Sequence, residues 1–206
     1  DTTPDFRFQM LRAKVTRLDA VLFTHPHKDH IAGLDDIRAF NFFSGKPMDI
    51  YANEMTQEDI IREFPYAFTD FRYPGVPEIR LNTIATEPFV VGDIEVVPVQ
   101  VWHMKMPVLG FRFGNFTYIT DANRVDEPER KKIRGSKVIV VNALRKEKHI
   151  SHFNLAEAIA FVQELPVPQA YFTHISHQLG KHADVAKELP EGMEQAHDGL
   201  EISVDG

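Results

Sequence analysis

Apolar segments rich in β-branched residues alternate with segments of helical periodicity along the whole sequence. Continuous or alternating apolar residues predict strands, and such segments cover residues 18–24, 48–52, 79–84, 89–101, 109–120, 137–143, 170–174 and 200–204. Helical periodicity covers residues 4–14, 31–42, 55–63, 154–164 and 183–189. The alternation predicts an α/β protein.

Two of the predicted helices begin with capping signals. Thr3 can cap the first helix, and Pro4 suits its first helical position. Asn154, with Glu157 three residues later, is typical of a capping box.

The order of the strands predicts two kinds of pairing. Strands 89–101 and 109–120 follow each other around the loop 104–107, which favours an antiparallel meander. The last short apolar strands alternate with helix 154–164, a pattern typical of buried strands covered by helices. We therefore expect a mixed β-sandwich with helices on its outer faces.

The sequence contains no repeat, low-complexity segment or Gly/Ser-rich linker. We therefore expect one domain over residues 1–206, and its longest loop in the Pro-rich segment 65–77.

The composition restricts the chemistry that the chain can use. Its 206 residues include 10 histidines and no cysteine, which excludes disulfides, cysteine nucleophiles and thiolate metal sites. Any metal must therefore be held by imidazole and carboxylate. The net charge of −7 argues against a nucleic-acid partner.

The sequence gives no sign of a membrane partner. It has no apolar run near the roughly 20 residues of a membrane span, and residues 1–5 lack the pattern of a signal peptide. We therefore expect a cytoplasmic protein.

The densest group of chemically active side chains follows strand 18–24. His25, His27, Asp29 and His30 lie within six residues, between an apolar strand and a predicted helix. A loop leaving the strand can direct the first two to one side and the last two to the other, so the segment could hold two adjacent metal ions. The alternative is an exposed polar turn.

This segment resembles the His-x-His-x-Asp-His signature of the metallo-β-lactamase superfamily. Later family positions follow in order: His103 and His174 at strand ends, and Asp121 after the strand ending at Thr120. Taken singly, each of these could be a structural histidine, a turn or a cap. The resemblance implies a four-layer αββα sandwich of two mixed β-sheets.

Within the superfamily, the sequence resembles the branch of phosphoribosyl cyclic phosphodiesterases and ribonuclease Z. The matching segments are 1–7, 33–36, 173–177 and 197–202, and His152 matches a histidine that these enzymes carry beside the metals. The N-terminal strands of that branch are not in this sequence, so we expect one sheet to be incomplete, or the sequence to be a piece of a longer chain.

The resemblance implies two divalent ions, zinc or manganese. One would be held by His25, His27 and His103, the other by Asp29, His30 and His174, with Asp121 between them as metal ligand and catalytic residue. A bridging hydroxide would then attack phosphorus.

Two further histidines complete the expected site. The resemblance makes His152 the catalytic acid or a group that stabilises phosphoryl oxygens, the alternative being a residue beside the Asn154 cap. His177 would bind substrate or orient a ligand. The remaining histidines lie among charged or turn residues, where we expect a solvated surface: His149, His182 and His197.

The resulting hypothesis is a phosphodiesterase that acts on a small nucleotide-like or cyclic phosphate; a homodimer is one option for its assembly. The alternative is a thioester hydrolase of the glyoxalase II type, in which hydroxide attacks a carbonyl. We expect β-lactam hydrolysis, processing of tRNA precursors and a non-enzymatic interaction module less, since all expected ligands are present and no long basic insertion occurs.

Overall fold

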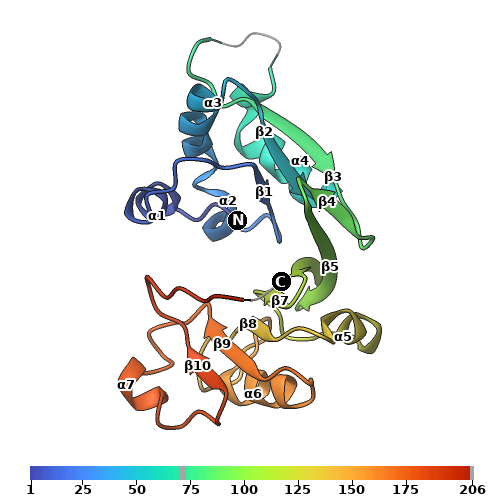
Figure 1. The fold of residues 1–206 in the computed structure, drawn as a ribbon, viewed down its shortest axis with the longest axis vertical. Coiled ribbons are helices and arrows are strands. Elements are labelled where there is room, and N and C mark those ends of the chain that lie inside the picture. Colours follow the sequence, from blue (N-terminus) through green and yellow to red (C-terminus); the bar gives the residue numbers. More distant parts are fainter. Residues whose placement is uncertain (70–72, 205–206) are drawn as a thin grey trace. The chain divides into compact units, whose positions relative to one another are not determined.

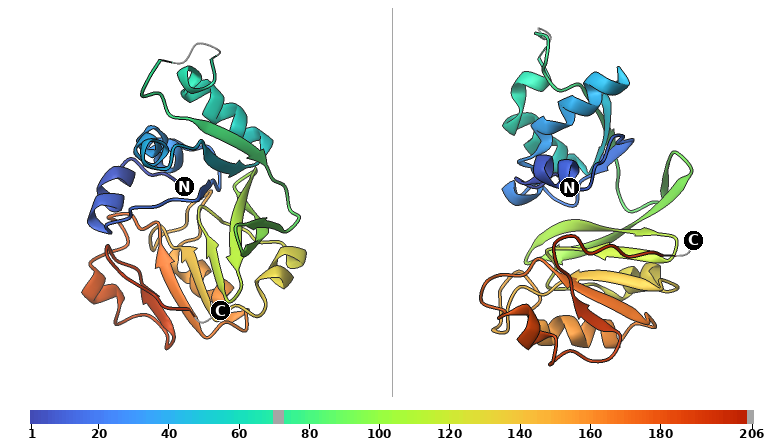
Figure 2. Two further views of the ribbon diagram at one scale, coloured as in Figure 1. Left: turned by 45° about the horizontal axis from the view of Figure 1, so that its top comes forward. Right: turned by 60° about the vertical axis from the view of Figure 1, so that its left-hand side comes forward.

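The chain forms two compact units in a computed structural model that describes residues 1–69 and 73–204 (Figures 1 and 2). The first unit comprises Asp1–Glu87 with Val91–Asp93, and the second comprises Pro88–Val90 with Ile94–Gly206. The expectation of a single domain stays a prediction.

The first unit is built on a three-stranded parallel sheet. Its strands are β1 (Ala20–Leu22), β2 (Met48–Ala52) and β3 (Ile79–Thr83), in that spatial order. The described helices are α1 (Phe6–Arg12), α2 (Lys28–Ile31), η1 (Leu34–Ile37), α3 (Arg38–Ser44), α4 (Glu54–Glu63) and η2 (Pro65–Ala67). Their apolar residues pack with the strands into one core that includes Phe23, Ile37, Ile50 and Ile60.

The second unit contains a seven-stranded mixed sheet of order β10-β9-β8-β7-β6-β5-β4. Its strands are β4 (Phe89–Val91), β5 (Ile94–His103), β6 (Met106–Phe113), β7 (Phe116–Ile119), β8 (Val138–Asn142), β9 (Gln169–Thr173) and β10 (Met193–Gln195). The pairs β5–β6 and β6–β7 are antiparallel, whereas β7–β8, β8–β9 and β9–β10 are parallel.

The described helices of this unit are α5 (Glu127–Ile133), α6 (Leu155–Gln163) and α7 (His182–Val185), and Figure 2 shows α6 along one face of the sheet. Helix α5 lies beside the antiparallel strand β5, where Glu129 Oε2 accepts from Gln100 N at 2.7 Å. Phe161 and Val162 of α6 pack in the same core as Ile139 and Val141 of β8. All five residues of β8 are buried, as expected for a central parallel strand. Since β7, β8 and β9 are parallel, the residues that follow them emerge at one edge of the sheet.

Most predicted elements are present, and two sheets are confirmed. The meander around residues 104–107 is confirmed by the antiparallel pairing of β5 with β6. The expectation that both sheets are mixed is wrong, because every pair in the three-stranded sheet is parallel. The predicted loop 65–77 contains η2, and its residues 70–72 lie outside the described residues.

Several element predictions are wrong, and two elements were missed. Residues 200–204 form no strand, whereas β10 and α5 were not expected. The helix expected over 31–42 is split into α2, η1 and α3 near Gly33. There the Gly33 N–H donates to Thr2 O, outside the helix, and a Cβ on Gly33 would lie 2.2 Å from Thr3 O.

The two predicted caps differ in outcome. The first helix takes Asp5 rather than Thr3 as its N-cap, with no side-chain cap bond. At α6 the capping box is confirmed: Asn154 Oδ1 accepts from Glu157 N at 2.8 Å, and Asn154 N donates to Glu157 Oε2 at 3.1 Å.

None of the helices in the described part of the chain is long and apolar enough to span a membrane.

Replacing Asn154 should lower the stability of the second unit. Asn154→Ala removes the cap acceptor at Glu157 N, so we expect the free energy of unfolding to fall by about 1 kcal/mol in urea titrations. Asn154→Asp keeps an acceptor and should lose much less. Lys181→Ala is the matched control, because the N-cap Lys181 of α7 makes no side-chain cap bond. Equal losses for all three variants would contradict the prediction.

Candidate metal and catalytic site

The first unit brings its four predicted ligands into one cluster after β1. The imidazole rings of His25 and His30 lie 4.1 Å apart between centroids, and those of His25 and His27 lie 4.7 Å apart. His25 and His30 are buried, whereas His27 and Asp29 are exposed. The short helix α2 begins after His27, so one turn of backbone carries Asp29 and His30.

The Asp1 carboxylate holds Thr24 and His30 of this cluster through hydrogen bonds. Its Oδ1 accepts from Thr24 N at 2.8 Å, and its Oδ2 accepts from Thr24 Oγ1 and His30 Nδ1, both at 2.9 Å. Because an ionised carboxylate only accepts, His30 carries its hydrogen on Nδ1. The Thr24 hydroxyl gives its hydrogen to Asp1, so its oxygen accepts from His25 Nδ1 at 2.9 Å. In both histidines the lone pair is therefore on Nε2, the arrangement of an imidazole that binds a metal.

Asp29 and His30 fit a bound cation. His30 Nε2 lies 3.5 Å from Asp29 Oδ2. With the His30 hydrogen on Nδ1, a lone pair faces a carboxylate oxygen, and a positive ion held by both atoms would stabilise this contact.

The second unit gathers a matching cluster at the ends of its strands. Asp121 follows β7, His174 follows β9, and His103 ends β5. Asp121 Oδ1 lies 3.1 Å from His174 Nε2, and Asp121 Oδ2 lies 3.3 Å from His152 Nε2. His152 stacks on His174 at 5.0 Å and meets the edge of His103 at 4.5 Å.

This donor set also fits a divalent transition metal. One nitrogen or oxygen from each of His103, Asp121 and His152 lies within 4.8 Å of the others, and all three residues are buried. His103 Nδ1 donates to the Ser151 carbonyl at 2.9 Å, so its lone pair is on Nε2. Imidazole nitrogen and carboxylate oxygen are ligands for zinc and manganese.

Asp121 and His174 of the second unit have a left-handed backbone. The φ angles are 56° at Asp121 and 53° at His174, a region that costs a residue with a Cβ about 1–2 kcal/mol. Such conformations persist only where the surroundings impose them, and they concentrate at functional sites.

Asn142, at the end of β8, supports the turn at Asp121. This fully buried side chain accepts from Ala122 N at 2.7 Å and donates to Ala122 O at 3.0 Å. The Ala122 carbonyl also accepts from Phe153 N at 2.7 Å. The residues beside Asp121 and His152 are therefore tied to the same buried group. Asn142 and Asp1 were not predicted to act in the site, although Asp1 belongs to a segment that resembles the family.

The expectation that His149 is solvated is wrong. His149 is partly buried, and its Nδ1 lies 3.1 Å from His152 Nδ1. Burial and then the neighbouring His152 and Arg145 lower the pKa of His149. His182 and His197 are exposed, as expected. His177 is exposed in a turn, and its role stays a prediction.

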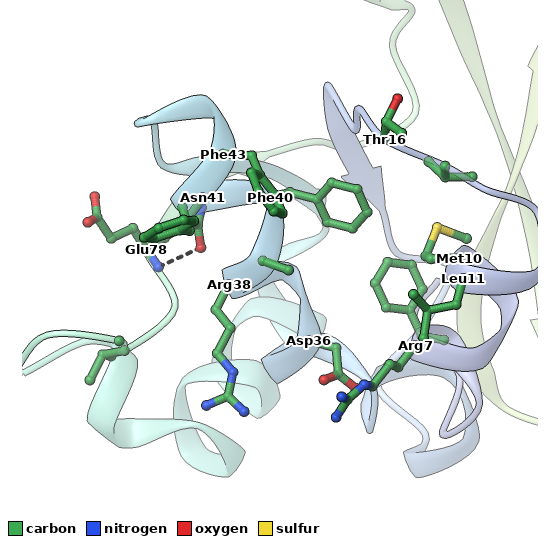
Figure 3. Close-up of a pocket in the computed structure, with 16 residues that line it drawn as sticks. Arg7, Met10, Leu11, Thr16, Asp36, Arg38, Phe40, Asn41, Phe43 and Glu78 are labelled. Carbon is green, nitrogen blue, oxygen red and sulfur yellow. Dashed lines mark hydrogen bonds between the residues drawn. The ribbon is translucent and has the colours of Figure 1, made fainter.

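The first unit also has a cavity of about 960 Å³ between α1, α3 and residues 75–78 (Figure 3). Its lining is mainly apolar, with Arg7, Asp36 and Arg38 among its labelled polar residues, and the predicted ligands are not among its lining residues. Asn41 closes one side by accepting from Glu78 N at 3.0 Å. The cavity is therefore distinct from the metal-ligand clusters.

Comparison with known proteins relates the chain to the β-lactamase superfamily. The sequence profile of the β-lactamase superfamily domain matches residues 1–175. A solved structure described as a new diphosphatase of the PhnP family is 34% identical, with a TM-score of 0.91. That match covers 100% of this chain and 79% of the diphosphatase chain.

Two curated relatives are longer than this chain. An octanoyltransferase from Porphyromonas gingivalis is 32% identical over 207 residues, which cover 100% of this chain and 42% of that protein. Ribonuclease Z from Nostoc sp. is 30% identical over 108 residues, which cover 50% of this chain and 32% of that protein. The chain therefore spans less than half the length of these relatives.

The left-handed backbone at His174 should reverse the usual order of stability, in which an alanine variant is more stable than a glycine variant. We expect His174→Gly to be about 1 kcal/mol more stable than His174→Ala, because only glycine adopts a φ of 53° without strain. Urea unfolding of the metal-free proteins measures the difference. Ala160→Gly, at an exposed position inside α6, is the control and should lose about 1 kcal/mol. A His174→Gly variant less stable than His174→Ala would contradict the strain argument.

Proposed function

Since the chain belongs to the metallo-β-lactamase superfamily, we propose that it is a dinuclear metal-dependent phosphodiesterase. Its substrate would be a small nucleotide-like or cyclic phosphate. The diphosphatase of the PhnP family and ribonuclease Z, to which the chain is similar, both have names that indicate cleavage at phosphorus, and this supports the choice.

The ligands of the two clusters would serve one centre in this proposal. His25, His27 and His103 would hold one ion, Asp29, His30 and His174 the other, and Asp121 would bind both. Support comes from the donor chemistry of each cluster and from the lone pairs on Nε2 of His25, His30 and His103. When bound, two zinc or manganese ions would activate water near neutral pH and stabilise charge on the attacking and leaving oxygens.

The observation that carries the proposal is the place of His152. Its Nε2 lies 3.3 Å from Asp121 Oδ2, among the expected metal ligands. As an imidazolium, His152 would carry a hydrogen on this Nε2 and could give it to a leaving oxygen, which leaves a neutral imidazole. A sugar alkoxide is a poor leaving group that needs this proton, whereas the thiolate released from a thioester is a good one. His152 therefore favours phosphodiester over thioester hydrolysis.

Other residues of the site would orient the Asp121 and His152 side chains or contact the substrate. Asp121 would hold His152 in place through Oδ2, while Thr120 Oγ1 donates to Asp121 Oδ1 at 2.7 Å and fixes the carboxylate. His177 is exposed near the end of the segment that follows β9, where it could contact the sugar or phosphate of the substrate.

Metal content and substrate class test the proposal directly. The purified protein should hold about two transition-metal ions per chain by elemental analysis. It should hydrolyse bis(p-nitrophenyl) phosphate with added Mn²⁺ or Zn²⁺ and leave S-lactoylglutathione intact. Asp121→Asn should lose both metal and activity, whereas His182→Ala, whose Nε2 contacts the Gln195 carbonyl, should keep both. Thioester hydrolysis without phosphodiester hydrolysis would replace the proposal with the glyoxalase-type alternative.

His152→Ala tests the acid role through the leaving group. We expect kcat to fall about 100-fold or more on diphenyl phosphate, because phenolate needs a proton. The loss should be much smaller on bis(p-nitrophenyl) phosphate, whose leaving group departs without help, and the metal content should not change. An equal loss on both substrates would argue for stabilisation of phosphoryl oxygens, and loss of metal would make His152 a ligand.

A further inference from the structure

His152 is held at both of its ring nitrogens. Nε2 faces the Asp121 carboxylate at 3.3 Å, and Nδ1 lies 3.1 Å from both His149 Nδ1 and Ser151 Oγ. The rings of His149 and His152 are 5.0 Å apart between centroids. His149 is thus the one histidine of this group for which the proposed function has no role.

The contact is suited to both protonation states of His152. Ser151 N–H donates to His149 Nδ1, so this nitrogen holds a lone pair and accepts the hydrogen on His152 Nδ1. His152 Nδ1–H donates to it both when the ring is neutral and when a second hydrogen on Nε2 makes it an imidazolium. Because the His152 ring has His149 as its partner in both protonation states, it keeps its orientation when the hydrogen on Nε2 is given up and regained.

His149 is itself restrained. Ser151 N donates to His149 Nδ1 at 3.4 Å, and Ser151 Oγ lies 3.3 Å from the same nitrogen. Arg145 holds the backbone before His149 by donating to the carbonyls of Glu147 and Lys148. Burial, and then the neighbouring His152 and Arg145, lower the pKa of His149, which favours the neutral ring that accepts at Nδ1.

We propose that His149 is a positioning residue for His152, which it holds through the Nδ1–Nδ1 hydrogen bond so that Nε2 is aimed at the leaving oxygen. This inference rests on the proposed function, in which His152 is the acid. His149 touches neither the substrate nor a metal ligand in this scheme, and acts only through the orientation and tautomer of His152.

Three substitutions at one position separate this role from a general effect on folding. His149→Ala should lower kcat on diphenyl phosphate about tenfold, the loss of a hydrogen bond of about 1.4 kcal/mol, and leave KM and metal content unchanged. His149→Asn should restore most of kcat, because the asparagine amide reaches the place of Nδ1. His149→Gln should not, since its amide reaches the place of Nε2. Ser151→Ala keeps the carbonyl that holds His103 and tests the competing partner.

Two further measurements decide whether the effect passes through His152. In the His152→Ala background, His149→Ala should lower kcat no further, whereas additive losses would overturn the proposal. In the metal-free protein, ¹⁵N chemical shifts of His152 should show a hydrogen on Nδ1, and His149→Ala should shift the tautomer toward a mixture. An unchanged His152 spectrum, or a full loss of kcat with Ser151→Ala and none with His149→Ala, would also overturn it.

The outcomes distinguish this inference from the proposed function. If His152→Ala is as active as the unmodified protein, the proposed acid is wrong and the role of His149 falls with it. If His152→Ala is inactive and His149→Ala is fully active, only the positioning role is wrong.

Discussion

The arrangement of the second cluster depends on one buried amide. Asn142 satisfies both the N–H and the carbonyl of Ala122, and that carbonyl also receives the Phe153 N–H. The left-handed turn at Asp121 costs about 1–2 kcal/mol, which is comparable with the roughly 0.5–1.5 kcal/mol that each hydrogen bond contributes. Without the amide, two backbone groups of a buried residue would lose a partner. The strain at Asp121 is thus offset by the strand beside it, rather than by the residues that would bind metal.

The first cluster is held in place by a different buried group. There a carboxylate, Asp1, replaces the amide and sets the tautomers of His30 directly and of His25 through Thr24. In the first unit this buried network fixes which nitrogen of His25 and His30 carries the lone pair, whereas in the second unit Asn142 holds the backbone beside Asp121. The exposed members, His27 and Asp29, lie at the open side of their cluster. The rigid part of each cluster is therefore the part that the core holds.

A local pattern indicated the first cluster and the family resemblance indicated the second, but neither identified Asp1 or Asn142 as supporting residues. The spacing of His25, His27, Asp29 and His30 is a local signal, and it correctly predicted that these side chains lie together. The contact between His149 and His152 could not be predicted from the sequence. It depends on the path of the backbone over residues 145–152, and hydrophobic periodicity does not indicate that path. Helix α5 is short and highly charged, so it lacks an apolar face. Residues 200–204 have the composition of a strand but find no partner in the described sheets.

The backbone at Asp121 and His174 also limits how the metal preference of this protein could be redesigned. Exchanging a ligand usually means exchanging the side chain alone, as at His25 or His103, where the backbone is not left-handed. At positions 121 and 174 the new residue must also accept a positive φ, which asparagine, aspartate and glycine tolerate and most others do not. A cysteine or glutamate at position 121 or 174 would destabilise the fold through backbone strain, whether or not a metal ion is bound. Softer or larger metals must therefore be accommodated from the remaining positions.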